Sequence, residues 1–465
     1  MYSLKEVIES KSLVVFGASR DPMKPGSLLI FALKSTGFTG NVAGINPQGG
    51  EVHGVPLYPK LADVPFPVDL AVLIIPPAAV VQSLRDCAER GVKGVVISAE
   101  GFAESGPEGR RYQEQVREIL QATGMRAFGP NTLGIVNTET GLCTSYGADP
   151  AMLKPGSIGF AAQSGIFVGA LLRNISSSGI HISKGFGLGN KVDVDESDIL
   201  EYLADDAQTR TIGLYVEDIR DGQRFFDIAR RTTASKPILM LKGGRTLAGA
   251  HAVSSHTASL AMDDAILNGV LRQVGVIRMY SVEEFVASLI GFDWTPLPRG
   301  NLIAVVTYSG AQAIMCVDAA TEAGLRLAQF SPATQERLAS IMPSAYKRQN
   351  PIDTYPDSNI KGFERTTIGV AHALLEADEV DAVIFISFAN NEVNPYGPIV
   401  DALKGRLTKP FFFCIAGSRT DVEETIKLLL ANRLPAVPYP DMAVRALTHM
   451  VGYARRVGVA PPLGE

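Results

Sequence analysis

A histidine within a segment of small residues is the clearest candidate for chemistry in this sequence. His256 lies in "SSHTAS", inside a stretch, 241–265, that is rich in Gly, Ala, Ser and Thr and holds a second histidine, His251. Such a stretch has little apolar surface to bury, so it predicts a loop, and loops often carry reactive groups. A core histidine, a metal ligand and a nucleophile are the roles open to His256. The small neighbours argue against the first, and the lack of a paired His or Cys nearby argues against the second.

A nucleophilic histidine needs one free ring nitrogen and an acceptor that holds the other. Glu217, in "GLYVEDIRDG", follows an apolar run and is expected at the carboxyl end of a strand, where site residues gather. It is a candidate for that acceptor, and equally for a solvated acid at a strand end. We interpret His251 as a loop histidine without an assigned role.

The turn after the first apolar run, "VVFGASRDPMKPGS", predicts an anion site. A strand that opens into a helix presents free N–H groups and the positive end of the helix dipole, which suits a phosphate. Only Gly17 matches the G-x-G-x-x-G fingerprint, which argues against a nicotinamide-dependent dehydrogenase. Arg20 and Lys24 fit phosphate contacts and solvated surface charges equally well. The residues expected around this ligand are Gly17, Ala18, Ser19, Arg20, Lys24, Ile75, Pro76, Pro77, Ser98 and Asn131.

A second anion site is expected in "AAQSGIF", where Gln163, Ser164 and Gly165 open a helix. The third part of the chain has a similar strand and turn at Ser309-Gly310, which indicates duplication of one flavodoxin-like unit. A tight strand-to-helix turn explains that Ser-Gly pair equally well.

Short apolar runs alternate with helical patterns along the whole chain, which predicts an α/β protein with parallel sheets. The expected domains are a Rossmann-like domain at 1–147, a flavodoxin-like domain at 148–295 that holds the His256 loop, and a second flavodoxin-like domain at 296–465. The runs expected as strands lie at 12–19, 41–47, 69–76, 93–99, 125–130, 157–165, 181–189, 211–218, 236–244, 274–281, 302–310, 325–330, 381–390, 409–418 and 435–441.

Composition excludes several classes of protein. The balance of 43 Lys+Arg against 48 Asp+Glu, without a basic stripe, argues against a nucleic-acid partner. The four cysteines lie far apart without a C-x-x-C pair, so neither a disulfide framework nor a metal site is expected. The most apolar stretch, "VDLAVLIIPPAAVV", is too short to span a bilayer, and "MYSLKEVIES" does not resemble a secretion signal. We expect a cytoplasmic protein.

The ordered set of motifs resembles the α subunit, or α-like part, of NDP-forming acyl-CoA synthetases, the superfamily of succinyl-CoA synthetase and ADP-forming acetyl-CoA synthetase. The resemblance extends over essentially the whole chain. It is carried by "GASRDP", "NPQGGEVHGVPLYP", "VDLAVLIIP", "GVKGVVIS", "GPNTLGIVNT", "QSG", "GLGNKVDVDESDILEYLADD", "LYVEDIRDG" and "KGGRTLAGAHAVSSHTASLA".

The resemblance implies a coenzyme A site in the first domain, a phosphohistidine at His256 and an orienting carboxylate at Glu217. It also implies that the helix opened by Ser164 and Gly165 holds the phosphoryl group. Inorganic phosphate would convert acyl-CoA to an acyl phosphate, and His256 would pass the phosphoryl group to ADP or GDP. No ATP-grasp segment is found, so we expect a separate ATP-grasp β chain that binds the nucleotide with Mg²⁺, in an α2β2 assembly or around an α homodimer.

Some positions depart from the family pattern, including Gln48 in "NPQGG", where the family usually has Lys. The alternative hypothesis is a non-catalytic module that binds CoA or acyl-CoA. The presence of His256, Glu217 and Ser164 favours the enzyme, because a binding module has no use for a nucleophile.

Overall fold

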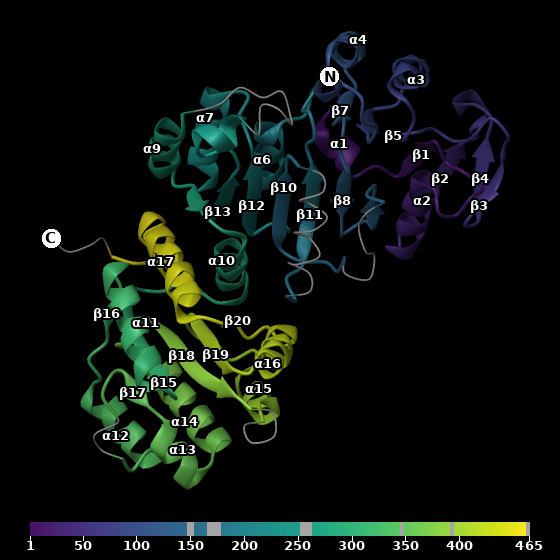
Figure 1. Ribbon diagram of the computed structural model, residues 1–465. Coiled ribbons are helices and arrows are strands. Elements are labelled where there is room, and N and C mark those ends of the chain that lie inside the picture. The colour runs from purple at the N-terminus through teal and green to yellow at the C-terminus, as the bar shows by residue number, and fades with distance from the viewer. Residues whose placement is uncertain (147–152, 165–177, 252–262, 345–347, 391–394, 462–465) are drawn as a thin grey trace. The chain divides into compact units, whose positions relative to one another are not determined.

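The computed structural model describes residues 1–146, 153–164, 178–251, 263–344, 348–390 and 395–461. The chain divides into two compact units, Met1–Arg278 and Met279–Glu465. Both units are α/β, and the helices flank the sheets (Figure 1). None of the helices in the described ranges is both long and apolar enough to cross a membrane.

The first sheet has the order β3-β4-β2-β1-β5-β6-β7 and is parallel except for the β3–β4 pair. Strand β1 is central, with β2 on one side and β5 on the other, so the chain changes direction across the sheet at this point. Ligands of such sheets bind beyond the carboxyl ends of the strands at this switch. The strands are β1 (Ser12–Phe16), β2 (Asn41–Ile45), β3 (Gly50–Val52), β4 (Val55–Tyr58), β5 (Leu70–Leu73), β6 (Gly94–Ile97) and β7 (Arg126–Phe128).

Helices cover both faces of this sheet because the β1 side chains alternate between them. Leu13 and Val15 belong to the apolar cluster that includes α2, whereas Val14 and Phe16 belong to the cluster that includes α3 and α4. The helices of this part are α1 (Leu4–Ile8), α2 (Pro25–Ser35), α3 (Pro77–Glu89) and α4 (Pro107–Thr123).

The second sheet has the order β14-β13-β12-β10-β11-β8-β9. Strands β10, β11, β12 and β13 are parallel, and β8 and β9 add an antiparallel edge. The elements are β8 (Ile135–Asn137), β9 (Leu142–Cys143), β10 (Ile158–Ala162), β11 (Ile182–Gly187), α6 (Glu196–Asp205), β12 (Thr211–Val216), α7 (Gly222–Thr232), β13 (Ile238–Lys242), α9 (Asp264–Val274) and β14 (Ile277–Met279).

The unit Met279–Glu465 contains a parallel sheet of order β16-β15-β18-β19-β20, with β17 beside β15. Helices α10, α11 and α17 share an apolar cluster with one face of this sheet. The elements are α10 (Val282–Trp294), β15 (Leu302–Thr307), α11 (Gly310–Glu322), β16 (Arg326–Leu327), α12 (Pro332–Ile341), β17 (Ile352–Asp353), α13 (Tyr355–Lys361), α14 (Phe363–Glu376), β18 (Ala382–Ala389), α15 (Gly397–Leu403), β19 (Phe411–Gly417), α16 (Arg419–Ala431), β20 (Ala436–Val437) and α17 (Pro440–Arg456).

The α/β class and every predicted strand are confirmed. The expectation of purely parallel sheets was incomplete, because the short pairs β3–β4 and β8–β9 are antiparallel. These strands are only two to four residues long, so they carry too little apolar periodicity to be recognised from sequence. The predicted boundaries after 147 and 295 remain predictions.

Candidate active site

The turn after β1 brings the backbone of the chain unusually close to the end of β5. Gly17 has φ 85°, and a Cβ atom at this position would lie 2.2 Å from the carbonyl oxygen of Ile74. A Cβ atom on Gly26, in the first turn of α2, would lie 2.5 Å from the carbonyl oxygen of Gly17. Only glycine fits either position, and the start of α2 therefore packs directly on the turn.

The start of helix α2 has one backbone N–H without a described bond, that of Gly26, because Pro25 has no N–H and the N–H groups of Lys24 and Ser27 donate to carbonyl oxygens. Lys24 is the N-cap residue, its side chain is exposed, and it makes no capping hydrogen bond. The buried Ser27 hydroxyl donates to the carbonyl oxygen of Ser19 at 2.7 Å and accepts from its backbone N–H at 3.3 Å. The serine pair fixes the turn, and anion binding at this helix N-terminus remains a prediction.

Arg20 connects the turns that follow β1 and β2. Its guanidinium donates from Nε to the carbonyl oxygen of Gly49 at 3.0 Å and from Nη2 to that of Gln48 at 2.8 Å. The side-chain amide of Asn46 donates to the carbonyl oxygen of Ala18 at 2.8 Å and reinforces the same connection. The bonds to Gln48 and Gly49 use two of the five N–H groups of the Arg20 guanidinium. A phosphate contact by Arg20 remains a prediction.

The remaining residues predicted for this site follow β5, β6 and β7, which are neighbours in the first sheet. Ile75 and Pro76 follow β5, and Pro77 is the first residue of α3. Ser98 follows β6, and its buried Oγ has no hydrogen-bond partner within the described ranges. Asn131 has φ 58° in the loop after β7. The sheet thus gathers the predicted residues at one edge, where a buried hydroxyl is left without a partner.

At the corresponding edge of the second sheet, Gln163 connects the ends of β10 and β12. Its Oε1 accepts from the backbone N–H of Glu217 at 2.9 Å and from that of Asp218 at 3.3 Å. Its Nε2 donates to Asp218 Oδ1 at 2.7 Å. Ser164, the next residue, is half-buried, and Gly165 lies outside the described residues. Phosphate binding by Gln163 and Ser164 remains a prediction.

Glu217 is a buried carboxylate that is only partly satisfied. The side chain is 6% exposed, and its Oε1 accepts a hydrogen bond from the Tyr215 hydroxyl at 3.3 Å. Burial, together with the Glu217 charge and this hydrogen bond, raises the pKa of Tyr215 to about 12. Glu217 Oε2 is buried and has no hydrogen-bond partner among the residues that the structure describes. Such an oxygen is costly to bury unless a donor occupies it during function.

The predicted histidine loop leaves the sheet beside this oxygen. Strands β12 and β13 are paired with Val216 opposite Lys242, so Glu217 and Gly243 leave their strands side by side. A Cβ atom on Gly243 would lie 3.3 Å from Cγ of Glu217. His256 lies outside the described residues, so its distance from Glu217 is not assigned. The interpretation of His251 as a loop histidine was wrong, because this exposed residue lies in a helical segment at 247–251.

Two buried lysines at this edge were not identified from the sequence. Lys191 is 2% exposed and lies 2.6 Å from Asp218 Oδ1 and 2.9 Å from Glu196 Oε2. Lys242 ends β13 and is 6% exposed; burial lowers its pKa, although nearby carboxylates, including Glu217, oppose the shift. The only sequence signal for Lys191 is its place among acidic residues in "GNKVDVDESD", a pattern that is equally typical of solvated surface.

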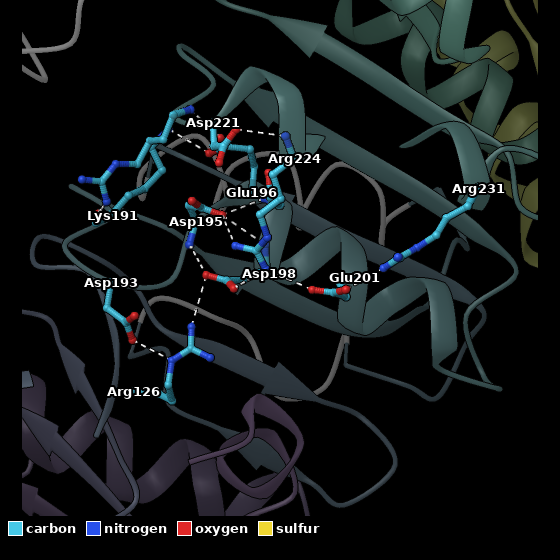
Figure 2. A network of polar contacts seen from close by, with 12 residues as sticks. Arg126, Lys191, Asp193, Asp195, Glu196, Asp198, Glu201, Asp221, Arg224 and Arg231 are labelled. Atoms are coloured by element: carbon cyan, nitrogen blue, oxygen red, sulfur yellow. Dashed lines mark hydrogen bonds and ion pairs between the residues drawn. The ribbon is translucent and has the colours of Figure 1, made fainter. Parts of the chain in front are cut away.

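A network of charged residues fixes the first sheet to the second (Figure 2). Arg126, on β7, binds Asp193 at 2.9 Å and Asp198, in α6, at 3.2 Å. Asp198 also binds Arg224 at 2.8 Å, and Arg224 in turn binds Glu201 at 3.0 Å. A groove of about 920 Å³ beside this network is lined by more acidic than basic residues, and Glu217 is not among the residues that line it. The contacts of Arg126 with Asp193 and Asp198 therefore hold the two sheets together, and the groove beside them is separate from Glu217.

Two family models match the chain. Residues 11–138 match a CoA binding domain, and residues 155–290 match a succinyl-CoA ligase like flavodoxin domain. The acetate–CoA ligase [ADP-forming] II of Archaeoglobus fulgidus is 37% identical over 97% of this chain and 67% of its own length. The α subunit of acetate–CoA ligase [ADP-forming] II of Pyrococcus furiosus is 34% identical over 96% of this chain and 97% of its own.

A solved structure agrees with these relatives. The dinucleotide-forming acetyl-coenzyme A synthetase 1 of Ca. Korarchaeum cryptofilum, in complex with phosphate and ADP, is 32% identical to this chain. Its TM-score is 0.89, and the match covers 99% of this chain and 98% of that chain. The resemblance inferred from the sequence motifs is confirmed.

Proposed function

The chain belongs to the family of ADP-forming acetate–CoA ligases and their α subunits, and on that premise we propose that it is the α chain of an acyl-CoA ligase. The proposed reaction joins a carboxylic acid and CoA to give acyl-CoA while a nucleoside triphosphate becomes the diphosphate and phosphate. The reaction is reversible. The first sheet binds CoA, in keeping with the family model that matches residues 11–138.

The observation that carries this proposal is the free carboxylate oxygen of Glu217 beside the start of the His256 loop. A histidine that accepts a phosphoryl group needs one ring nitrogen to attack phosphorus and an acceptor for the N–H of the other. Glu217 Oε2 supplies that acceptor. The carboxylate fixes the tautomer of His256 and stabilises the positive charge that its ring develops on phosphorylation.

The cycle has three steps. In the direction that makes the nucleoside triphosphate, inorganic phosphate attacks the carbonyl carbon of acyl-CoA, the C–S bond breaks, and free CoA and an acyl phosphate are formed. His256 then attacks the phosphorus of the acyl phosphate, releasing the carboxylate and forming phosphohistidine. The phosphoryl group finally passes to ADP or GDP. The backbone N–H groups at Ser164 and Gly165 neutralise the charge of the phosphoryl group.

The nucleotide step requires a partner in this proposal. Two relatives are named as α subunits, and they match this chain over nearly their whole length. We assign the nucleotide and its Mg²⁺ to an ATP-grasp β chain and propose an α2β2 assembly, or one built around an α homodimer.

Labelling with radioactive inorganic phosphate tests the first two steps. The purified chain is incubated with labelled phosphate and a panel of short aliphatic, hydroxylated and aromatic acyl-CoAs, alongside His256→Ala. Label that is acid-labile, alkali-stable and absent from the variant supports the phosphohistidine, and the active acyl-CoA identifies the substrate class.

If neither protein takes label, the assay is repeated with the ATP-grasp chain and ATP labelled at its γ-phosphate. Label on the wild type alone would then indicate an enzyme that depends on its partner. Failure of both assays, with CoA still bound, would instead support a non-catalytic CoA-binding module.

A further inference from the structure

Lys191 is a buried cation whose hydrogen bonds all go to groups at the Glu217 edge of the second sheet. It has a left-handed backbone conformation, φ 54°, and is 2% exposed. Its Nζ donates to Asp218 Oδ1 at 2.6 Å, to the Asp218 carbonyl oxygen at 3.1 Å and to Glu196 Oε2 at 2.9 Å. Figure 2 shows Lys191 and Glu196 within the charged network. The three N–H donors of the ammonium group are thus satisfied by one carbonyl oxygen and two carboxylates.

The contacts continue from Lys191 to the backbone of Glu217. Asp218 Oδ1, which accepts from Lys191, also accepts from Gln163 Nε2 at 2.7 Å. The Oε1 of the same amide accepts from the backbone N–H of Glu217 at 2.9 Å. Lys191 therefore fixes the amide that joins the end of β10 to the end of β12, and Ser164 and Glu217 leave the sheet at these two ends.

The loop that carries Lys191 is itself anchored to the first sheet. The backbone N–H of Asn190 donates to the carbonyl oxygen of Pro130 at 2.9 Å, and that of Val192 donates to Gly129 at 2.9 Å. The Asn190 side chain donates to Glu104 Oε2 at 2.5 Å, in the loop region after β6. These bonds hold the Lys191 loop against the first sheet. Through Lys191, they also hold Asp218 and the end of β12 in place.

We infer that Lys191 is a positioning residue for the phosphoryl transfer to His256. Acting through Asp218 and Gln163, it holds the backbone of Glu217 so that the free Oε2 keeps its orientation toward the histidine loop. The inference rests on the proposed function. Lys191 touches neither the phosphoryl group nor the acyl-CoA in this role, so its loss should slow the transfer and leave substrate binding unchanged.

Lys184 provides a matched control. It is 1% exposed on β11 of the same sheet and is also held by polar side chains, Gln208 at 2.9 Å, Glu139 at 3.3 Å and Asp206 at 3.5 Å. None of these groups is bonded to Gln163 or Glu217 among the described contacts. Lys191→Met leaves the buried Glu196 and the partly buried Asp218 without their cation, and Lys184→Met does the same to the partly buried Asp206, so both variants should lower the melting temperature.

The experiment measures the maximum rate of phosphohistidine formation and the acyl-CoA concentration that gives half of that rate, in the full chain and under the conditions that label the wild type. For Lys191→Met we expect the maximum rate to fall about tenfold or more, with the half-saturating concentration within about twofold of the wild-type value. Lys184→Met should retain wild-type values of both quantities. Asp218→Asn, which weakens the same contact from the other side, should show a smaller loss of the same kind and decides the matter if Lys191→Met does not fold.

Three results would overturn the inference. These are a wild-type maximum rate in Lys191→Met, an equal loss in Lys184→Met, or a change confined to the half-saturating concentration. If Lys191→Met does not fold, a wild-type rate in Asp218→Asn overturns it as well. If the wild-type chain takes no label in either assay, the proposed function itself is contradicted. This outcome differs from failure of the Lys191 inference, because it is seen in the wild type without any substitution.

Discussion

Replacement of Glu217 by Gln should separate the stability of the fold from its proposed chemistry. The substitution keeps the shape of the side chain and removes its charge. The Tyr215 hydroxyl, 3.3 Å from Oε1 in the wild type, can still donate to the amide oxygen of Gln. Oε2 has no partner to lose, so the folded protein gives up no hydrogen bond at this atom.

The expected change in stability follows from that geometry. A carboxylate that is 6% exposed with one unpartnered oxygen carries a desolvation cost that a neutral amide reduces. We expect the free energy of unfolding of the unit Met1–Arg278 to stay constant or rise by about 1 kcal/mol, which corresponds to roughly 2–4 °C in melting temperature.

The same substitution should slow phosphohistidine formation, although it leaves stability unchanged or raised. A hydrogen bond to a charged partner contributes about 1.5–3 kcal/mol, so its loss should slow phosphohistidine formation by about 10- to 150-fold. The amide can also turn its NH2 group toward the ring, which favours the unproductive tautomer. Single-turnover labelling with radioactive phosphate measures the rate, and thermal unfolding monitored by circular dichroism measures stability.

Glu284→Gln is the matched control, because Glu284 is a similarly buried carboxylate, 5% exposed, in the other unit. It should label at the wild-type rate. A wild-type rate in Glu217→Gln would refute the orienting role of this carboxylate. A loss of stability greater than about 2 kcal/mol would show that Oε2 has a structural partner. It would refute the inference that this oxygen is left for His256.

Three further substitutions have defined outcomes. Gly17→Ala forces a side chain into a position with φ 85°, 2.2 Å from a carbonyl oxygen, and should cost about 2–3 kcal/mol of stability and weaken CoA binding, as measured by thermal unfolding and calorimetry. Asn190→Ala removes the bonds to Glu104 and Gln113 that anchor the Lys191 loop, so it should lower the maximum labelling rate about fivefold without changing the half-saturating acyl-CoA concentration; a change confined to the half-saturating concentration would contradict this. Burial alone would raise the pKa of Glu284, but hydrogen bonds, chiefly from His449, outweigh burial and lower the pKa below its ordinary value of 4.5. The ionised carboxylate therefore stabilises the protein above pH 4.5, and this stabilisation is lost as the pH falls through the lowered pKa. Glu284→Gln should therefore flatten the acid limb of a plot of melting temperature against pH, and an unchanged limb would contradict the assignment.

The sequence predicted the fold class well because most buried strands are short runs of largely apolar residues, as in β1, β10 and β12. The same feature located the ends of β10 and β12, and hence Gln163 and Glu217, since site residues of parallel sheets lie at strand ends. The pairs β3–β4 and β8–β9 escaped prediction because two to four residues cannot establish an alternating pattern.

Lys191 escaped prediction for a different reason. Its partner Asp218 is 27 residues away in the sequence, and the contact exists only because the loop after β11 lies beside the end of β12. A lysine between Asn and Val in a run of acidic residues is typical of a solvated surface. Only the packing of the two sheets shows that the ammonium group is buried.

The first turn shows how an incomplete motif can still indicate a function. The absence of G-x-G-x-x-G argued against a nicotinamide cofactor, and the structure shows what replaces its later glycines. The close contact between helix and turn is made by Gly26, nine residues after Gly17. The longer turn in between lets Arg20 bind the carbonyl oxygens of Gln48 and Gly49, so the turns after β1 and β2 form one connected rim. A rim that extends over two strands, with helix donors at its base, offers an extended surface to a phosphorylated ligand, which is what the proposed CoA site requires.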